Sequence, residues 1–153
     1  MARNEQADSR TTGARGFSRW MQLKANARTM TRIRRGRGTS MGMNLLILHT
    51  VGRRSGQPRQ SPLAWFPDGE SSWLVIASGG GDHNPAWFAN MMANPDAVSV
   101  ELPGKDAVAV TVQRLDGADR APAWQRILAA QPRFEKYQRK SVREYPVVRL
   151  VAK

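Results

Sequence analysis

Two apolar runs separated by a short bend rich in glycine and arginine constrain the fold of this chain most strongly. Residues 45–48 are all Leu or Ile, and residues 57–66 form a second strand-like run that ends at a Pro-Asp-Gly turn. Between the runs, Gly52 and Gly56 supply the conformational freedom that a tight bend needs. The pattern predicts two antiparallel strands joined by a hairpin.

The bend carries more positive charge than a simple turn requires. Arg53, Arg54 and Arg59 lie within seven residues, and Ser55 and Ser61 add hydroxyl groups to the same segment. Guanidinium groups bind flat carboxylates and phosphates through paired hydrogen bonds, and the backbone N–H groups of a glycine-rich bend attract anions. The hairpin is therefore predicted to bind a phosphorylated or carboxylated ligand.

The rest of the chain predicts further strands with helices between them. Strands are expected at residues 73–77, 97–102, 107–114 and 146–151, and helices at residues 85–92, 118–130 and 134–138. The first of these helices is expected to have Asn84 as its N-cap. About six strands without regular βαβ alternation predict a mainly β, α+β fold, an antiparallel barrel with helices packed outside.

A basic N-terminal segment precedes this barrel. Ten of the 24 Lys and Arg residues lie in the first 40 residues, against two of the 12 acidic residues. Residues 1–16 are expected to form a disordered basic arm, and residues 17–153 a single domain that begins with an amphipathic helix at about 17–33. The apolar stripe of this helix contains Phe17, Trp20, Met21, Ala27 and Met30. Packing of the stripe on the core is favoured, and peripheral contact with an anionic membrane is the alternative.

Composition excludes several kinds of site. The 153 residues include no cysteine, which removes disulfides, thiolate metal sites and cysteine nucleophiles and favours a reducing, cytoplasmic setting. His49 and His83 are the only histidines, neither has a second ligand at metal-binding spacing, and His49 is expected to be structurally partnered. No metal site is therefore predicted, and no Gly-x-Ser-x-Gly elbow supports a hydrolase.

A second glycine-rich segment, residues 78–84, follows a predicted strand and precedes the helix that begins near Pro85. This arrangement points backbone N–H groups at an anion. The segment lacks the P-loop lysine and the G-x-G-x-x-G spacing, so neither a nucleoside-triphosphate site nor a Rossmann site is indicated. Together with the arginine hairpin, it suggests a ligand with an anionic tail and an aromatic head.

Three segments in combination, residues 50–63, 76–81 and 84–95, closely resemble the deazaflavin-dependent nitroreductase family. The resemblance extends from about Trp20 to Val148 and places the chain in the flavin/deazaflavin oxidoreductase split-barrel superfamily. It implies a split β-barrel, related to the FMN-binding barrels of the pyridoxamine-phosphate-oxidase type. It also implies binding of coenzyme F-420, an 8-hydroxy-5-deazaflavin with a phosphate and an oligoglutamate tail.

The resemblance also implies which residues bind the coenzyme. The phosphate and carboxylate tail correspond to Arg53, Arg54, Ser55 and Arg59. The strand beneath the deazaflavin ring corresponds to Gln60, Ser61, Pro62, Leu63 and Ala64. The loop that edges the ring corresponds to Ile76, Ala77, Ser78 and Gly79. The helix start that closes the pocket corresponds to Ala86, Trp87, Phe88, Ala89 and Asn90.

Membership of this family implies an oxidoreductase. The reduced deazaflavin gives a hydride to a small electron-poor acceptor, a quinone, a conjugated enone or lactone, or a nitroaromatic compound, while the protein holds ring and acceptor face to face. Ser78 and Tyr137 are the candidate proton donors or substrate contacts, beside water.

Two alternatives remain open from the sequence. One is an FMN-binding reductase on the same barrel. The other is a non-catalytic basic module in which the arm and the arginine hairpin bind nucleic acid or anionic lipid. No aromatic residues are interleaved with the arginines of the arm, and no helix-turn-helix or stacking platform is present, so no specific nucleic-acid partner is expected.

Overall fold

The computed structural model describes residues 21–79 and 81–153. The predicted disordered arm, residues 1–16, lies outside the described residues, as do Phe17 and Trp20. Within the described part, no helix is long and apolar enough to cross a membrane.

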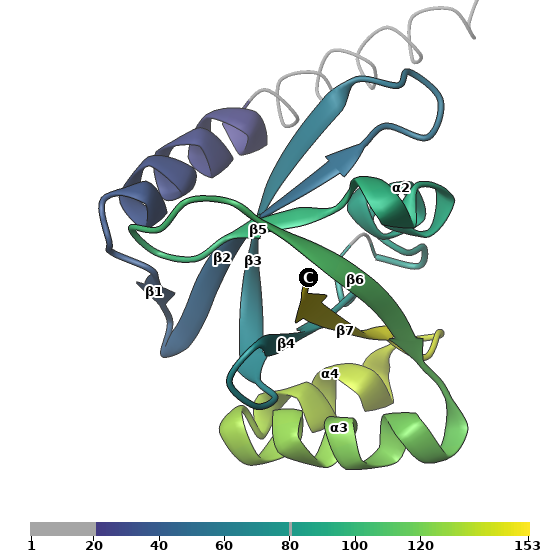
Figure 1. Cartoon of the computed structure of the whole chain (residues 1–153). Helices are drawn as coiled ribbons and strands as arrows, with labels where there is room; N and C mark the ends of the chain where they lie inside the picture. The colour runs from purple at the N-terminus through teal and green to yellow at the C-terminus, as the bar shows by residue number, and fades with distance from the viewer. Residues whose placement is uncertain (1–20, 80) are drawn as a thin grey trace, which may run out of the picture.

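Six antiparallel strands of the described chain close into a barrel (Figure 1). Around the barrel they follow the order β2 (Met43–Val51), β3 (Pro58–Pro67), β4 (Ser72–Ile76), β7 (Val147–Ala152), β6 (Val108–Leu115) and β5 (Ser99–Glu101). Pairing of β5 with β2 closes the ring, and the short β1 (Thr39–Ser40) pairs antiparallel with the first residues of β2. The predicted antiparallel barrel with outer helices is thus confirmed.

The predicted hairpin joins β2 to β3. The two strands pair continuously from Asn44 opposite Trp65 to Val51 opposite Pro58. The bend is closed by hydrogen bonds from the Gly52 N–H to the Gln57 carbonyl and from the Gly56 N–H to the Gly52 carbonyl, both 2.9 Å. Gly56 adopts φ +67°, a left-handed conformation that favours glycine.

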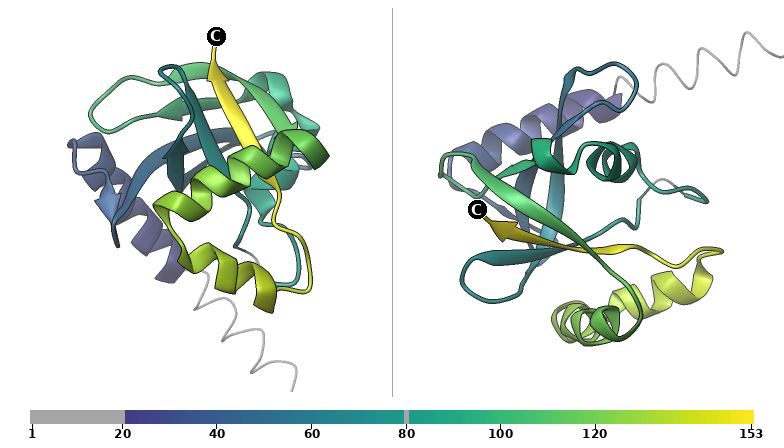
Figure 2. Two further views of the ribbon diagram at one scale, coloured as in Figure 1. Left: turned by 90° about the horizontal axis from the view of Figure 1, so that it is seen from below. Right: turned by 45° about the vertical axis from the view of Figure 1, so that its right-hand side comes forward.

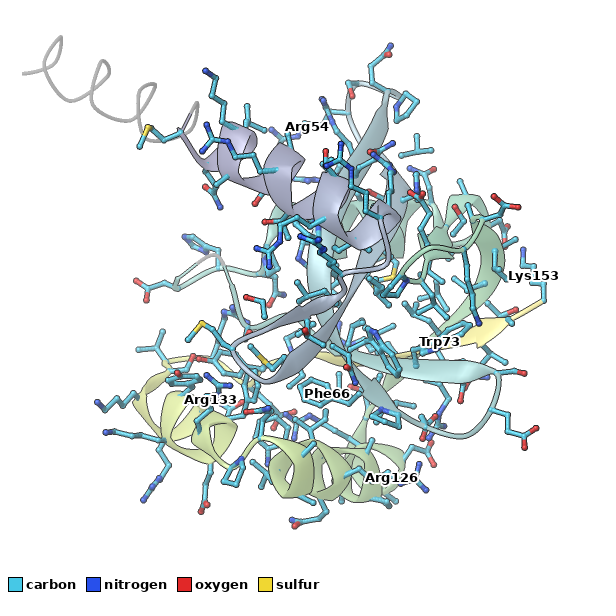
Figure 3. All side chains as sticks on the ribbon, turned by 90° about the vertical axis from the view of Figure 1, so that its left-hand side faces the viewer. Arg54, Phe66, Trp73, Arg126, Arg133 and Lys153 are labelled. Atoms are coloured by element: carbon cyan, nitrogen blue, oxygen red, sulfur yellow. The ribbon has the colours of Figure 1, made fainter. Side chains whose placement is uncertain are left out.

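Strand β4 is apolar on both faces because both of its faces are covered. Successive β4 residues alternate between two clusters: Trp73 and Val75 join the barrel interior, whereas Leu74 and Ile76 face a second cluster that includes Phe66. Helices α3 (Gly117–Ala130) and α4 (Arg133–Lys140) cover this second cluster (Figures 2 and 3). The same alternation that predicts a strand therefore specifies which residues the outer helices bury.

Helix α2 (Ala86–Ala93), followed by the 3-10 turn η1 (Pro95–Ala97), packs Phe88 and Met91 against the barrel interior. The prediction of Asn84 as the N-cap of α2 is wrong. Pro85 occupies the N-cap position, and no side chain caps the helix there. The Asn84 side chain instead accepts a hydrogen bond from Arg143.

The N-terminal helix covers residues 21–34 of the described chain. Ile33 is fully buried and Met30 is half-buried, so the end of the helix packs on the barrel. The prediction that the apolar stripe packs on the core is wrong for Met21 and Ala27, because both residues are exposed. The first turns of the helix run toward the β2–β3 bend, where they line a hollow described below, rather than over the core.

Candidate functional site

Three hollows adjoin one another along one side of the barrel. The first, the arginine hollow, lies between the N-terminal helix, the β2–β3 bend and α2, and has a volume of about 350 Å³. The middle hollow has about 180 Å³ and the α4 hollow about 530 Å³. Trp87 lines both the arginine and the middle hollow, and Ser78, Gly79 and Phe134 line both the middle and the α4 hollow. Neighbouring hollows thus share lining residues from the bend to α4, and the three adjoining hollows together are called the groove.

The arginine hollow brings together nine of the predicted coenzyme-binding residues. They are Arg53, Arg54, Ser55, Arg59, Gln60, Ser61, Ala86, Trp87 and Asn90. The hollow has no acidic side chain in its lining, and within residues 21–79 and 81–153 its three arginines have no ion-pair partner. Three uncompensated guanidinium groups around one hollow attract a polyanion.

Helix α2 positions the bend through Asn90. This side chain is only 6% exposed, and its Oδ1 accepts hydrogen bonds from the backbone N–H and from Nη1 of Arg53, both 3.1 Å. On the other side of the bend, the Ser55 hydroxyl accepts from Arg59 Nη2 at 3.4 Å and from the Gln57 N–H at 3.2 Å. Arg53 and Arg59 are thus held by hydrogen bonds within the protein.

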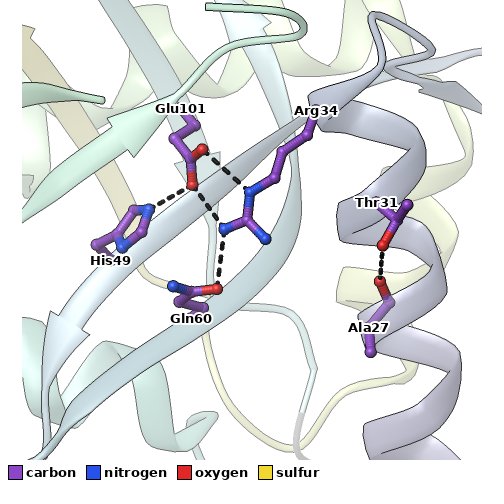
Figure 4. Close-up of polar contacts among 6 residues, drawn as sticks. All are labelled: Ala27, Thr31, Arg34, His49, Gln60 and Glu101. Atoms are coloured by element: carbon purple, nitrogen blue, oxygen red, sulfur yellow. Dashed lines mark hydrogen bonds and ion pairs between the residues drawn. The ribbon is translucent and has the colours of Figure 1, made fainter. Parts of the chain in front are cut away.

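A polar network fastens the N-terminal helix to the floor of the arginine hollow (Figure 4). Arg34 donates to both Glu101 carboxylate oxygens, at 3.2 and 3.0 Å, and to Gln60 Oε1 at 3.0 Å. His49 Nε2 lies 2.6 Å from Glu101 Oε2, so this histidine is structurally partnered as expected. The hydrogen bond from Arg34 is the main cause of the lowered pKa of Glu101; burial opposes it and His49 reinforces it.

Most of the residues that line the middle hollow are apolar. Its lining is Pro62, Leu63, Ala64, Phe66, Ile76, Ser78, Gly79, Trp87 and Phe134. Of these, Pro62, Leu63, Ala64, Ile76, Ser78 and Gly79 are predicted to lie beneath or beside the deazaflavin ring, and Trp87 is predicted to close the pocket. Three other predicted residues do not line these hollows, since Ala77 and Phe88 are buried in the barrel core and Ala89 is half-buried on α2.

The α4 hollow holds both candidate proton donors. Ser78 lines it from the glycine-rich loop and Tyr137, 45% exposed, lines it from α4. The hollow is shared with the middle hollow through Ser78, so a compound bound beside α4 has access to the end of the apolar region.

Several residues of the groove were missed from the sequence. Leu23 and Asn26 of the N-terminal helix line the arginine hollow, as does Gly52. Their helical spacing places Leu23 and Asn26 on one face, but nothing local to the helix indicates that this face meets the hairpin. Arg143 was also missed: it lies outside the lining of the groove but binds the glycine-rich loop, and its own connection has no periodic signal.

Residues 20–152 match the family described as F420H(2)-dependent quinone reductase. The chain belongs to this family. The resemblance to deazaflavin-dependent reductases inferred from the sequence is thereby confirmed.

Individual relatives agree with the family match. An F420H(2)-dependent quinone reductase of Mycobacterium tuberculosis is 31% identical over 143 residues, which cover 86% of this chain and 95% of that protein. A solved structure of an F420-H2 dependent reductase, FDR-A, is 32% identical with a TM-score of 0.60, and the match covers 69% of this chain and 92% of that chain. A further solved chain, described as a domain-swapped dimer, is 28% identical with a TM-score of 0.61, covering 87% of this chain and 98% of the other.

Proposed function

We propose that this protein is a deazaflavin-dependent oxidoreductase that transfers a hydride from reduced coenzyme F-420 to a quinone. One observation carries the proposal: three arginines with no acidic partner among the described residues surround one end of a groove whose middle is lined mainly by apolar residues and whose far end is lined by hydroxyl-bearing residues, Ser78 and Tyr137 among them. The positively charged end fits the anionic tail of the coenzyme, the apolar middle fits its flat ring, and the far end fits the acceptor. The family match supports the same cofactor and acceptor class.

The residues of the groove fit the coenzyme. Arg53, Arg54 and Arg59 would hold its phosphate and carboxylates through charge-assisted hydrogen bonds, with Ser55 beside them. The apolar lining of the middle hollow would hold the ring. When bound, the deazaflavin supplies the hydride.

The protein itself contributes orientation and a proton. An acceptor bound in the α4 hollow would lie at the end of the ring-binding region. Holding ring and acceptor next to each other lowers the entropic cost of bringing them together for hydride transfer. Reduction of a quinone to a hydroquinone takes one hydride and one proton. We assign that proton to the Ser78 or Tyr137 hydroxyl group, because both residues line the hollow given to the acceptor; water then restores the proton.

The arginine clamp is tested by replacing Arg54 and Arg59 singly and together by methionine. Each substitution is expected to weaken coenzyme binding by about 1.5 kcal/mol, roughly tenfold in Kd, because a hydrogen bond to a charged group is lost. The matched control is Arg139→Met on α4, an exposed arginine outside the groove lining. Coenzyme affinity is measured by fluorescence titration and turnover by anaerobic reduction of a soluble quinone; unchanged Kd in the double variant contradicts the clamp.

We further propose that the N-terminal helix contacts an anionic membrane surface, where lipid-soluble quinones reside. The supporting observation is that Met21 is 53% exposed on a helix that also carries Arg28 and Arg32. The full chain is expected to sediment with vesicles containing anionic lipid and not with neutral vesicles. Met21→Glu is expected to reduce this binding without changing coenzyme affinity; equal sedimentation of both proteins contradicts the contact.

A further inference from the structure

Arg143 links the two sides of the α4 hollow. It lies in the connection between α4 and β7, which runs beside the glycine-rich loop (Figure 2). Its Nη1 donates to the Ala77 carbonyl at 2.8 Å and to Asn84 Oδ1 at 2.9 Å, its Nη2 to the Gly79 carbonyl at 2.7 Å, and its Nε to the Gly81 carbonyl at 3.2 Å. One guanidinium group therefore binds four acceptors spread over residues 77–84.

The backbone of Arg143 is held to α4. Gln138 donates from Nε2 to the Arg143 carbonyl and accepts at Oε1 from the Tyr145 N–H, both at 2.8 Å. The Tyr145 hydroxyl donates to the Tyr137 carbonyl at 3.1 Å, and the Arg143 guanidinium lies 5.0 Å from the centre of the Tyr145 ring. The position of the Arg143 side chain is thus set by the helix that carries Tyr137.

These two sets of bonds join opposite walls of one hollow. The loop wall includes Ser78, Gly79 and Gly81, and the helix wall includes Phe134 and Tyr137. Glycine residues have the largest backbone entropy to lose on ordering and no side chains to pack. The four bonds from Arg143 therefore restrain a loop whose glycines have no side chains to pack.

We propose that Arg143 is a positioning residue that fixes the glycine-rich loop relative to α4 and thereby limits the size of the acceptor that the α4 hollow admits. The inference rests on the proposed function, because it assigns the α4 hollow to the acceptor. Arg143 is absent from the lining of all three hollows, so its effect passes through the loop and α4 rather than through contact with the acceptor.

The test compares Arg143→Met, which removes all donors, with Arg143→Lys, which keeps the charge and loses the planar fork. Arg139→Met on the exposed side of α4 is the control. Each protein is assayed for coenzyme Kd, for kcat and KM with a small benzoquinone and with a bulky substituted naphthoquinone, and for amide hydrogen exchange in residues 78–84. Free guanidinium ion at millimolar concentration is added to the Met variant as chemical rescue.

In both Arg143 variants, kcat/KM for the small quinone is expected to fall on the order of tenfold, since misplacement by about 1 Å can cost up to about a hundredfold. Activity with the bulky quinone falls less or rises, coenzyme Kd stays within about twofold, and loop amides exchange faster, because the arginine hollow does not depend on this link. Guanidinium restores the Met variant in part. Equal losses with both quinones, or exchange identical to the wild-type protein, overturn the proposal.

A milder variant keeps the proposal testable if Arg143→Met does not fold. Asn84→Ala removes one of the four acceptors and leaves the arginine in place, so a smaller shift toward bulky acceptors is expected from it. If the wild-type protein reduces no acceptor with the deazaflavin, the proposed function fails. Loop exchange and its response to guanidinium still decide whether Arg143 holds the loop.

Discussion

Replacing Glu101 by glutamine is expected to weaken the attachment of the N-terminal helix to the barrel. Glu101 accepts two hydrogen bonds from Arg34 and lies 2.6 Å from His49, and its side chain is 15% exposed. Glutamine keeps the shape and one acceptor oxygen but loses the charge. Gln60, on the floor of the arginine hollow, shares the same arginine, so the loss also reaches the candidate site.

The expected loss of stability depends on how far the Arg34–Glu101 pair is buried. A hydrogen bond to a charged group contributes about 1.5–3 kcal/mol, whereas an exposed ion pair contributes about 0.2–1 kcal/mol. Because Glu101 is mostly buried and Arg34 is 44% exposed, the pair lies between these limits, at about 1.5 kcal/mol. In a chain of 153 residues this corresponds to a fall in Tm of about 3–6 °C.

Thermal unfolding followed by circular dichroism measures this difference near neutral pH and in acid. The pKa of Glu101 is lowered in the folded protein, so its charge stabilises the fold above the ordinary carboxylate range and stops doing so as pH falls through the folded pKa. The gap between the wild-type protein and Glu101→Gln is therefore expected to close in acid. Glu144→Gln is the matched control, since Glu144 is 72% exposed in its pair with Arg120. Equal Tm losses in the two variants, or a gap independent of pH, would refute this reasoning.

Two further variants examine the β2–β3 bend. Asn90→Ala removes the oxygen that accepts twice from Arg53, so coenzyme affinity measured by calorimetric titration is expected to fall about five- to tenfold, and an unchanged Kd counts against a fixed bend. Gly56→Ala forces a side chain into φ +67° with no atom within 4 Å of the new Cβ, so urea unfolding is expected to show a loss of about 1 kcal/mol from backbone strain alone. Stability equal to the wild-type protein contradicts that cost.

The sequence predicted the parts of the fold that depend on neighbouring residues. The apolar run in β2, the glycines of the bend and the return strand are local signals, and the hairpin formed as expected. Closure of the barrel places Ile47 opposite Glu101 across a long stretch of chain, and no local pattern encodes that pairing. The N-cap prediction failed for the same kind of reason, because Arg143 binds the Asn84 side chain from 59 residues away.

The anion-binding part of the candidate site could be predicted because its charged residues lie close together in the sequence. Three arginines in seven residues indicated an anion site, and the structure places all three around one hollow. The walls contributed by distant elements were not predictable, because Leu23 looks like part of any amphipathic helix. Arg143 resembles any surface arginine until its acceptors on the glycine-rich loop are seen.

The central claim is tested most directly by a fluorescence titration of the purified full chain with oxidised coenzyme F-420, run beside flavin mononucleotide at moderate salt. Saturable binding of the deazaflavin, much tighter than that of the flavin and weakened in the Arg54→Met/Arg59→Met double variant, is the predicted result. Tighter binding of flavin mononucleotide, or saturable binding of neither compound, would contradict the assignment of the groove to the deazaflavin coenzyme.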